Sequence, residues 1–587
     1  MINLTRCLAF AAALAVTPAW AGPVEDYEAL REEMWQAVLD QSPSLATSLG
    51  DRRGDGMLED LSLAAYDRRV DEAGQYLARL EAIDAAALPD ALRVDRAILR
   101  RSLEDRIAAA RHDHDRFVVF TNRGGWFLGF AGLPERSPFF TLADYESYVG
   151  RLESFIRVNE DGIARSREAV ARGLTQPCEP IRGLGARVRA LISEDPRASL
   201  FWAPFRQRPE TITERQWEAL QARAAAAIED GVMPAYEDLA TFLEREYEPR
   251  CREGLPGISQ TPGGAEYYAH RVRQFTTTDL TPEDVHELGL AEVARIRAEM
   301  EQVAARAGFA SREEFISHLR TDAQYYLTDP EAYLAHAAAL AKRIDGWMPR
   351  LFGRLPRTPY TVLPIPPAQA PGNTTAYYEP GSLAAGRPGI YRVNTTELDQ
   401  RPLWELPALG VHEAVPGHHH QIALQQELDI HPLRANGTFF TAFVEGWGLY
   451  SERLGIEMGL YDTPAKDMGR LSYEMWRAAR LVVDTGIHAK GWSKQQAVDF
   501  MLVNTALSAA NIDAEVNRYI TTPGQAVAYK IGELKIRELR LLAEEALGTR
   551  FDLRAFHDAV LENGAVPLDV LEQHIEGWID RQRGEAG

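Results

Sequence analysis

Cysteine is scarce in this sequence, which has three cysteines among 587 residues. So few cysteines exclude a small scaffold held together by many disulfides and a metal site built mainly from thiolates. A glycine-rich phosphate loop and a G-x-S-x-G nucleophile motif are also missing. Their absence counts against a nucleotide-binding enzyme and against a serine hydrolase.

Positive charge is in short supply as well. The chain has 64 lysines and arginines against 85 aspartates and glutamates, which gives a formal net charge of -21. Nucleic-acid binding needs concentrated positive charge, so we expect no nucleic-acid partner. The 45% apolar and 25% charged residues are typical of a globular protein, and the length allows a large core and more than one structural unit.

The first 21 residues have the pattern of a secretory signal peptide. Arg6 precedes an apolar run at 8–16, and Ala19-Trp20-Ala21 matches an A-x-A cleavage site. The apolar run is too short to span a bilayer as a mature helix. We therefore expect cleavage after Ala21, a periplasmic or secreted protein, and no stable membrane insertion.

Apolar residues recur at helical spacing through most of the chain, which predicts a mainly α fold. A Pro- and Gly-rich joint at 252–272 is the best internal boundary, so we predict an N-terminal helical region at 22–255 and a C-terminal region at 256–587. Few stretches look like strands, and these lie in the irregular segment 355–400. The remaining C-terminal helices are predicted at 281–306, 311–319, 330–353, 403–428, 438–459, 463–490, 494–510 and from about 524 onward.

Residues 412–421, HEAVPGHHHQ, hold four histidines and a glutamate. Neutral imidazole is a common ligand of catalytic divalent metals. The opening His412–Glu413 pair resembles the start of the HExxH zinc-hydrolase motif, in which the histidine binds metal and the glutamate acts on water. This segment therefore predicts a zinc site in which His412 is a ligand and Glu413 is the general base.

The spacing departs from HExxH, because Pro416 stands where the second histidine of the motif would be. His418 is six residues after His412, about 240° further round a straight helix. Both can face one ion only if the helix is interrupted, and Pro416 favours such an interruption. His418 is the preferred second ligand by spacing, and His419 remains the alternative.

A third ligand is expected from residues 438–458, which read as an amphipathic helix. Glu445 lies among aromatic side chains there, a setting that disfavours an unpaired carboxylate. Zinc peptidases commonly use two histidines and one carboxylate, so Glu445 is the expected third ligand of one Zn²⁺ per chain. The alternative is a buried glutamate paired with an arginine. Glu452 is expected to support the site or to face solvent.

Cys178 and Cys251 remain after signal cleavage. In an oxidising compartment two cysteines can form one disulfide, but spacing alone does not show whether they are close. The pairing is left open.

Several motifs occur together in the order found in one known family. They are HEAVPGH at 412–418, FVEGWGLYSE at 443–452, RLVVDTGIH at 480–488 and EVNRYITTPGQAVAYKIGELKI at 515–536. By these motifs the chain resembles the bacterial domain-of-unknown-function 885 family, strongly from about residue 260 onward. That family is similar in plan to the all-helical zinc peptidases, namely angiotensin-converting enzyme, the neurolysin-like oligopeptidases and the thermostable carboxypeptidases. The resemblance implies a large helical zincin-like body with a deep channel and a small β-sheet beside the metal helix.

The resemblance also implies that His488 and Tyr529 donate hydrogen bonds to the substrate oxyanion during hydrolysis. From the residues alone, each could equally be a structural residue of the core. Further candidates for contacts with substrate or with the ligands are His419, Tyr450, Arg480, Arg518, Tyr391 and Asn394.

Tyr391 and Asn394 belong to a strand-like stretch at 389–395. By analogy with other zinc peptidases, we expect an edge strand here that pairs with the extended substrate backbone. The alternative is an ordinary structural strand.

These expectations together predict a periplasmic zinc metallopeptidase that hydrolyses short peptides. The alternatives are a metal-dependent hydrolase of a non-peptide amide and a non-catalytic periplasmic protein that binds metal or peptide.

Overall fold

The protein is mainly α-helical, with 69% helix and 4% strand in the computed structural model, as the sequence predicts. The structure describes residues 22–366, 370, 374–383 and 386–584. The predicted signal peptide lies outside these residues. Within the described part of the chain, no helix has both the length and the apolar character needed to cross a bilayer.

Twelve α-helices precede the Pro- and Gly-rich joint. They are α1 (Pro23–Gln41), α2 (Pro43–Ser48), α3 (Leu63–Ala82), α4 (Asp90–Ala109), α5 (Asp113–Phe117), α6 (Trp126–Ala131), α7 (Leu133–Arg136), α8 (Leu142–Ala171), α9 (Cys178–Ile181), α10 (Leu184–Arg189), α11 (Glu214–Ala226) and α12 (Met233–Phe242). Short π-helical turns extend α11 and α12, so the chain stays helical to residue 247.

The C-terminal region holds the other helices. They are α13 (Gly264–Thr276), α14 (Pro282–Arg306), α15 (Arg312–Thr321), α16 (Pro330–Asp345), α17 (Met348–Leu351), α18 (Leu406–Glu413), α19 (His418–Glu427), α20 (Pro432–Asn436), α21 (Thr441–Leu454), α22 (Pro464–His488), α23 (Lys494–Asn504), α24 (Ala509–Thr521), α25 (Ala528–Leu547), α26 (Leu553–Leu561) and α27 (Leu568–Gly584). The predicted helix at 403–428 is wrong as a single element, because the chain breaks between α18 and α19. The sequence reading also missed α24 as a separate helix.

Helix starts follow local sequence signals. Thr281 begins α14 and Ser493 begins α23, and each forms a reciprocal capping box with the side chain three residues later. Such caps satisfy backbone N–H groups that have no partner within the helix. The long helix α22 is buried on nearly all sides from Met468 onward, which makes it the central element of the C-terminal core.

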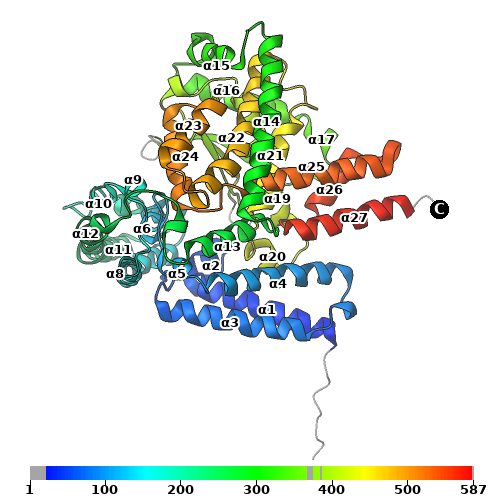
Figure 1. Ribbon diagram of the computed structural model, residues 1–587. Coiled ribbons are helices and arrows are strands. Elements are labelled where there is room, and N and C mark those ends of the chain that lie inside the picture. The colour runs from blue at the N-terminus through cyan, green and yellow to red at the C-terminus, as the bar shows by residue number, and fades with distance from the viewer. Residues whose placement is uncertain (1–21, 367–369, 371–373, 384–385, 585–587) are drawn as a thin grey trace, which may run out of the picture.

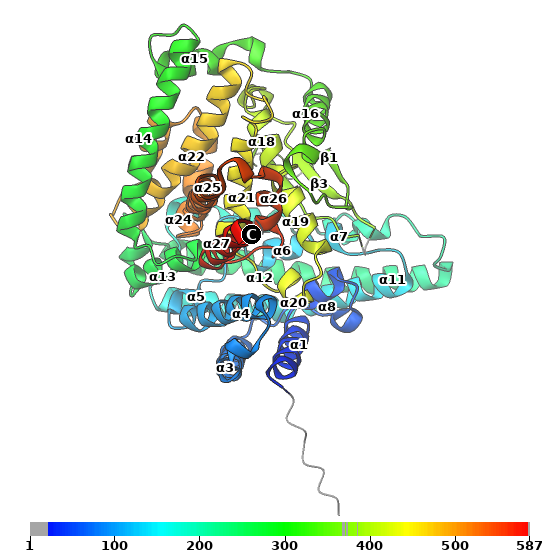
Figure 2. The same ribbon diagram turned by 90° about the vertical axis from the view of Figure 1, so that its right-hand side faces the viewer.

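Three large apolar cores and one small cluster around Phe117 organise the described part of the chain. One lies within residues 120–247, and another joins α1, α3 and α4 to Leu433 of α20. The third and largest lies almost entirely beyond residue 268. Figures 1 and 2 show α1, α3 and α4 as a layer beneath α13 and α20. The N-terminal helices therefore cover one side of the C-terminal body.

A three-stranded sheet forms within residues 355–400, where strands were predicted. It consists of β1 (Tyr360–Pro364), β2 (Ala376–Glu379) and β3 (Gly389–Val393), in the order β1-β3-β2. β3 pairs parallel to β1 and antiparallel to β2. The sheet packs beside α18 and α19. Because β3 is central, its backbone is occupied on both sides, and the expectation that it pairs with substrate as an edge strand is wrong.

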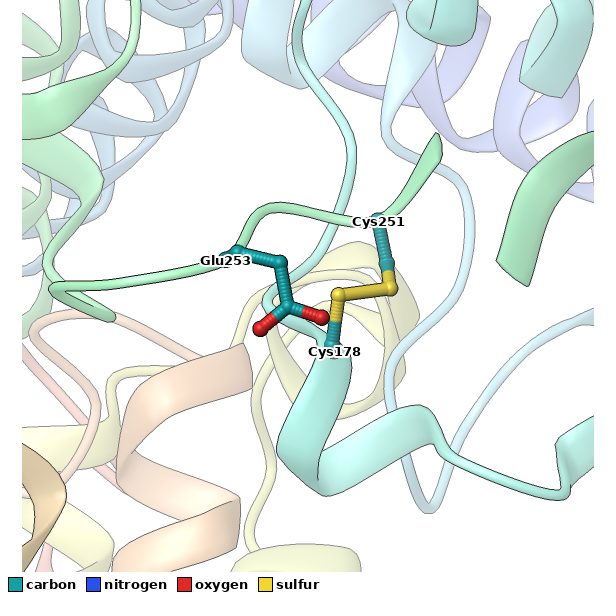
Figure 3. A group of neighbouring side chains, drawn as sticks. All are labelled: Cys178, Cys251 and Glu253. Carbon is teal, nitrogen blue, oxygen red and sulfur yellow. A yellow bond between two sulfur atoms is a disulfide. The ribbon is translucent and has the colours of Figure 1, made fainter. Parts of the chain in front are cut away.

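Cys178 and Cys251 form a disulfide with their Cα atoms 4.8 Å apart (Figure 3). Glu253 lies next to them, but sulfur atoms joined in a disulfide are not thiolate ligands. The bond closes a loop over a sequence separation of 73 residues. It ties the start of α9 to the chain that leads into the C-terminal region, and it answers the question that cysteine spacing left open.

Candidate metal centre

The break between α18 and α19 brings the two histidines together. The N–H of Gly417 donates to the carbonyl of Val411 at 2.9 Å, which closes a tight turn. A Cβ atom at position 417 would lie 1.9 Å from the carbonyl oxygen of His412, so this turn requires glycine. The rings of His412 and His418 consequently stand 4.7 Å apart, between their centroids, despite the six-residue spacing.

Glu445 of α21 completes a group of three. Nitrogen atoms of His412 and His418 and a carboxylate oxygen of Glu445 all lie within 4.8 Å of one another. The Glu445 oxygen is 3.7 Å from Nε2 of His412 and 3.4 Å from Nε2 of His418. Two imidazoles and one carboxylate are a donor set typical of catalytic zinc, which keeps a further position for water. The residues present therefore fit the metal that the sequence predicts.

The orientation of His412 is controlled from α21. Its Nδ1 atom lies 2.8 Å from Oε1 of Glu452, so Nε2 is left to face Glu445. Gly448 allows this approach, because a Cβ atom there would lie 2.8 Å from the ring of His412. A carboxylate that holds the second ring nitrogen is the usual support of a metal-binding histidine. The structure thus places Glu452 in the supporting position.

Arg477 of α22 was not recognised from the sequence. Its guanidinium lies 3.1 Å from the same oxygen of Glu452, and both side chains are buried. The two side chains therefore form a buried ion pair behind His412. The available signal was the depth at which α22 is buried, since an arginine within such a helix must have a partner.

Without a metal, the three groups form a coupled ionic cluster. Burial opposes charge on His412, but the carboxylates of Glu445 and Glu452 beside it raise its pKa to about 9. Burial also opposes charge on Glu445, yet its contacts with His412 and His418 hold the pKa of this carboxyl well below its usual value. Among the described residues the ion-pair partners of Glu445 are the two histidines and not an arginine, which was the predicted alternative.

Glu413 follows directly after the first histidine, at the end of α18, and is 9% exposed. Burial raises the pKa of its carboxyl, while the neighbouring His412 and His418 oppose the rise. Tyr391 of β3 is buried close enough for the charge of Glu413 to contribute to raising the pKa of the phenol. The Tyr391 hydroxyl has no hydrogen-bond partner among the described residues. Glu413 therefore combines a raised pKa with a position beside the candidate ligands, as a general base requires.

The predicted alternative ligand, His419, points elsewhere. Its Nδ1 atom lies 3.0 Å from the hydroxyl of Tyr378 on β2. Burial lowers the pKa of His419 to about 4, so this imidazole stays neutral. The geometry therefore places His418, and not His419, beside His412 and Glu445. Asn394 also has a structural role, because its amide nitrogen donates a hydrogen bond to the carbonyl of Ala370.

His488 has both ring nitrogens engaged by the backbone. Nδ1 accepts from the N–H of Ile258 at 3.0 Å, and Nε2 lies 3.0 Å from the carbonyl oxygen of Tyr519. Burial lowers its pKa to about 4. This geometry corrects the predicted catalytic role, because the imidazole has no nitrogen left for a substrate and instead locks α22 to the joint before α13.

Tyr529 lies near the candidate metal centre. Burial raises the pKa of its hydroxyl, and the charge of Glu445 raises it further. The guanidinium carbon of Arg480 lies 4.3 Å from the centre of the Tyr529 ring. Arg480 and Arg518 both bind the carboxylate of Glu515. Arg480 therefore packs on the tyrosine ring and is itself held by the carboxylate that also binds Arg518.

Tyr450, another predicted contact residue, does not join this group. Its hydroxyl bonds with Nε2 of His557 at 2.9 Å and accepts from Arg540 at 3.2 Å. It is a packing residue between α21, α25 and α26.

Comparison with known proteins identifies relatives of unknown function. The family model described as bacterial protein of unknown function (DUF885) matches residues 43–575. The crystal structure of the putative lipoprotein from Colwellia psychrerythraea is similar with a TM-score of 0.88 and 27% identity, over 95% of this chain and 100% of that chain. A putative lipoprotein of unknown function from Shewanella oneidensis shares the fold, with a TM-score of 0.69 and 17% identity over 94% and 99% of the two chains. No curated protein matches the sequence.

Proposed function

This chain belongs to the DUF885 family of bacterial proteins, and we propose that it is a zinc-dependent metallopeptidase that hydrolyses short peptides. The convergence of His412, His418 and Glu445 within 4.8 Å carries the proposal. Glu413 stands next to the first ligand, which a purely structural metal site would not need. The proposal includes a zincin-like arrangement in which α18 is the metal-binding helix and the substrate reaches it through a channel.

A bound zinc ion would polarise the substrate carbonyl and lower the pKa of a water molecule towards neutrality. Glu413 then accepts a proton from the attacking water and passes it to the leaving amine. Its raised pKa suits both halves of this transfer. Glu452 holds the Nδ1 proton of His412, so that Nε2 stays available to the metal.

Tyr529 is the remaining candidate donor to the substrate oxyanion. Its hydroxyl is kept protonated by burial and by the charge of Glu445. A donor aimed at developing negative charge is worth several kcal/mol in such reactions. Both the position of Tyr529 and its support by Arg480 favour this role over a purely structural one.

A location outside the cytoplasm is part of the proposal. The signal-peptide pattern at 1–21 predicts export, and a disulfide is typical of oxidising compartments. Two structural neighbours carry the description putative lipoprotein. In this chain Cys7 precedes the apolar run of the signal sequence, which is not the position of a lipid-modified cysteine. We therefore favour a protein released into the periplasm.

The direct test measures zinc content and peptide hydrolysis for wild type and Glu413→Gln. We expect about one zinc in both proteins and cleavage of a mixed peptide library by wild type alone, with at least a hundredfold loss in the variant. Zinc without any cleavage would redirect the proposal to another amide substrate or to a binding role. Failure to bind zinc would remove the metal site altogether.

A further inference from the structure

A second site lies between the N-terminal helices and the C-terminal body. It is a cavity of about 500 Å³ whose walls come from α3, α4, α5 and α13, and from the segment 437–441 that leads into α21. None of the three candidate metal ligands lines it. In Figures 1 and 2 the helices α4 and α13 run next to one another at this junction.

Positively charged residues outnumber negatively charged ones in the lining of this cavity, although the whole chain carries a net charge of -21. Arg69, Arg106 and Arg271 face two carboxylates, those of Asp105 and Asp115. Asp105 is already paired, at 3.3 Å, with an arginine that does not line the cavity. Asp115 accepts a hydrogen bond from a tyrosine hydroxyl at 2.8 Å. Positive charge therefore remains in excess.

Arg106 is the least satisfied of the three arginines. Arg106 lines the cavity, and it forms no ion pair with any residue in the part of the chain that the structure describes. Burial lowers the pKa of Arg106, and the charge of nearby Arg69 lowers it further. Arg271 has a buried Nε that lacks a hydrogen-bond partner among the described residues. An anion between these guanidinium groups would relieve their repulsion and supply acceptors.

The segment at the cavity wall leads directly to the candidate metal centre. Thr441 lines the cavity and begins α21, and Glu445 follows one helical turn later on the same face. At 1.5 Å per residue, the two positions are about 6 Å apart along the helix. The start of α21 has neither a side-chain cap nor an acidic residue in its first turn. Its dipole therefore adds to the positive potential of the cavity.

We propose that this cavity binds a carboxylate of the peptide substrate, held by Arg106 with Arg69 and Arg271. The inference rests on the proposed peptidase function and names its substrate class. An extended peptide advances about 3.5 Å per residue, so a spacing of about 6 Å corresponds to roughly two residues between the carboxylate and the bond that is cleaved. The carboxylate is either the C-terminus of the peptide or an acidic side chain near that end.

The test compares fluorescein-labelled randomised pentapeptides made as free acids and as C-terminal amides. Binding is measured by fluorescence anisotropy on zinc-supplemented Glu413→Gln, and cleavage is measured with wild type. Arg106→Gln and Arg69→Gln are then introduced separately. Arg100→Gln is the matched control, because Arg100 lies on the same helix but pairs with Glu104 outside the cavity.

We expect free acids to bind at least tenfold more tightly than amides, as for a charge-assisted hydrogen bond. Arg106→Gln and Arg69→Gln should each reduce this preference, while Arg100→Gln keeps it. A third set of peptides, C-terminal amides that contain one glutamate, shows which carboxylate the cavity binds. Tight binding of this set would mean that the cavity binds an acidic side chain and not the C-terminus.

Equal binding of acids and amides with no gain from glutamate would overturn the inference, and so would an undiminished preference in both cavity variants or an absence of peptide binding. Preferential binding without cleavage would instead support the carboxylate site and count against the peptidase function. Melting temperatures show whether each variant folds, and the two cavity arginines provide independent tests.

Discussion

Nδ1 of His412 lies 2.8 Å from a carboxylate oxygen of Glu452, so a side chain on α21 orients an imidazole on α18. Glu445, the third member of the candidate metal centre, is on the same helix, seven residues earlier. One helix thus supplies both a predicted ligand and the support for another. The alignment of α21 against α18 consequently determines how His412 and Glu445 face one another.

Replacing Glu452, which holds His412 in position, should weaken metal binding without removing a ligand. For Glu452→Gln we expect zinc affinity to fall roughly 10- to 100-fold, because the carboxylate no longer fixes His412. Competition with a chelator measures the change. The control is Glu457→Gln, which removes a carboxylate paired with Arg540 at 2.8 Å. Equal affinity in both variants would show that Glu452 does not support the ligand.

Two glycines of α21 should respond differently to the same substitution. A Cβ at 448 would lie 2.8 Å from the His412 ring, so Gly448→Ala should displace the imidazole and reduce zinc content. A Cβ at 446 would lie 2.5 Å from the backbone of Gly532 on α25. Gly446→Ala should therefore separate two helices and lower the melting temperature, at a cost of about 1–3 kcal/mol or more. Zinc content and thermal unfolding of both variants give the comparison, and an identical response would contradict it.

Asp484 of α22 should make stability depend on pH. Burial raises the pKa of its carboxyl from 3.8 to about 7, against hydrogen bonds from Tyr268 and Gly524 that lower it. Between pH 3.8 and about pH 7, Asp484 holds a proton in the folded protein that it has released in the unfolded chain. Stability therefore falls as the pH rises through this range. Asp484→Asn removes this titration. The stability of the variant relative to wild type should increase by about 3 kcal/mol between pH 5 and pH 8.

Denaturant unfolding at the two pH values measures this difference. A constant difference would mean that Asp484 is ionised in the folded protein throughout the range.

Removing the disulfide should destabilise the protein. The double substitution of Cys178 and Cys251 by alanine should lower the free energy of unfolding by about 2–4 kcal/mol, because the unfolded chain gains freedom in the closed loop. Melting temperatures with and without reductant test this. Reductant should lower the melting temperature of wild type and leave the melting temperature of the double variant unchanged. An insensitive wild type would contradict the expected contribution of the bond.

The sequence predicted which residues make up the candidate site better than it predicted how they are arranged. His412 and His418 were predicted from the histidine cluster that opens like an HExxH motif, and Glu445 from its position among apolar side chains. An interruption at Pro416 was expected, but the shape of the turn that brings the two histidines together could not be derived, since it depends on Gly417 packing against the carbonyl of His412. Their role as zinc ligands stays a prediction.

Features that depend on distant contacts were beyond sequence reasoning. The helical class and many helix ends follow from periodicity and caps. The central position of β3 in the sheet does not follow from these local signals, because strand order depends on which strands pair with it. The role of Arg477 depends on Glu452, 25 positions earlier, and the pairing of Cys178 depends on a folded loop. The carboxylate cavity also requires helices that are far apart in the chain.

The reversal between α18 and α19 bears on how metal-dependent enzymes are recognised in genomes. When one helix carries both histidines, their separation is restricted to about one turn. When the chain leaves one helix and enters another, a separation of six positions can serve the same centre. A pattern search that demands histidines four apart passes over this arrangement. Paired histidines on either side of a Pro-Gly step are a more suitable query for proteins of this kind.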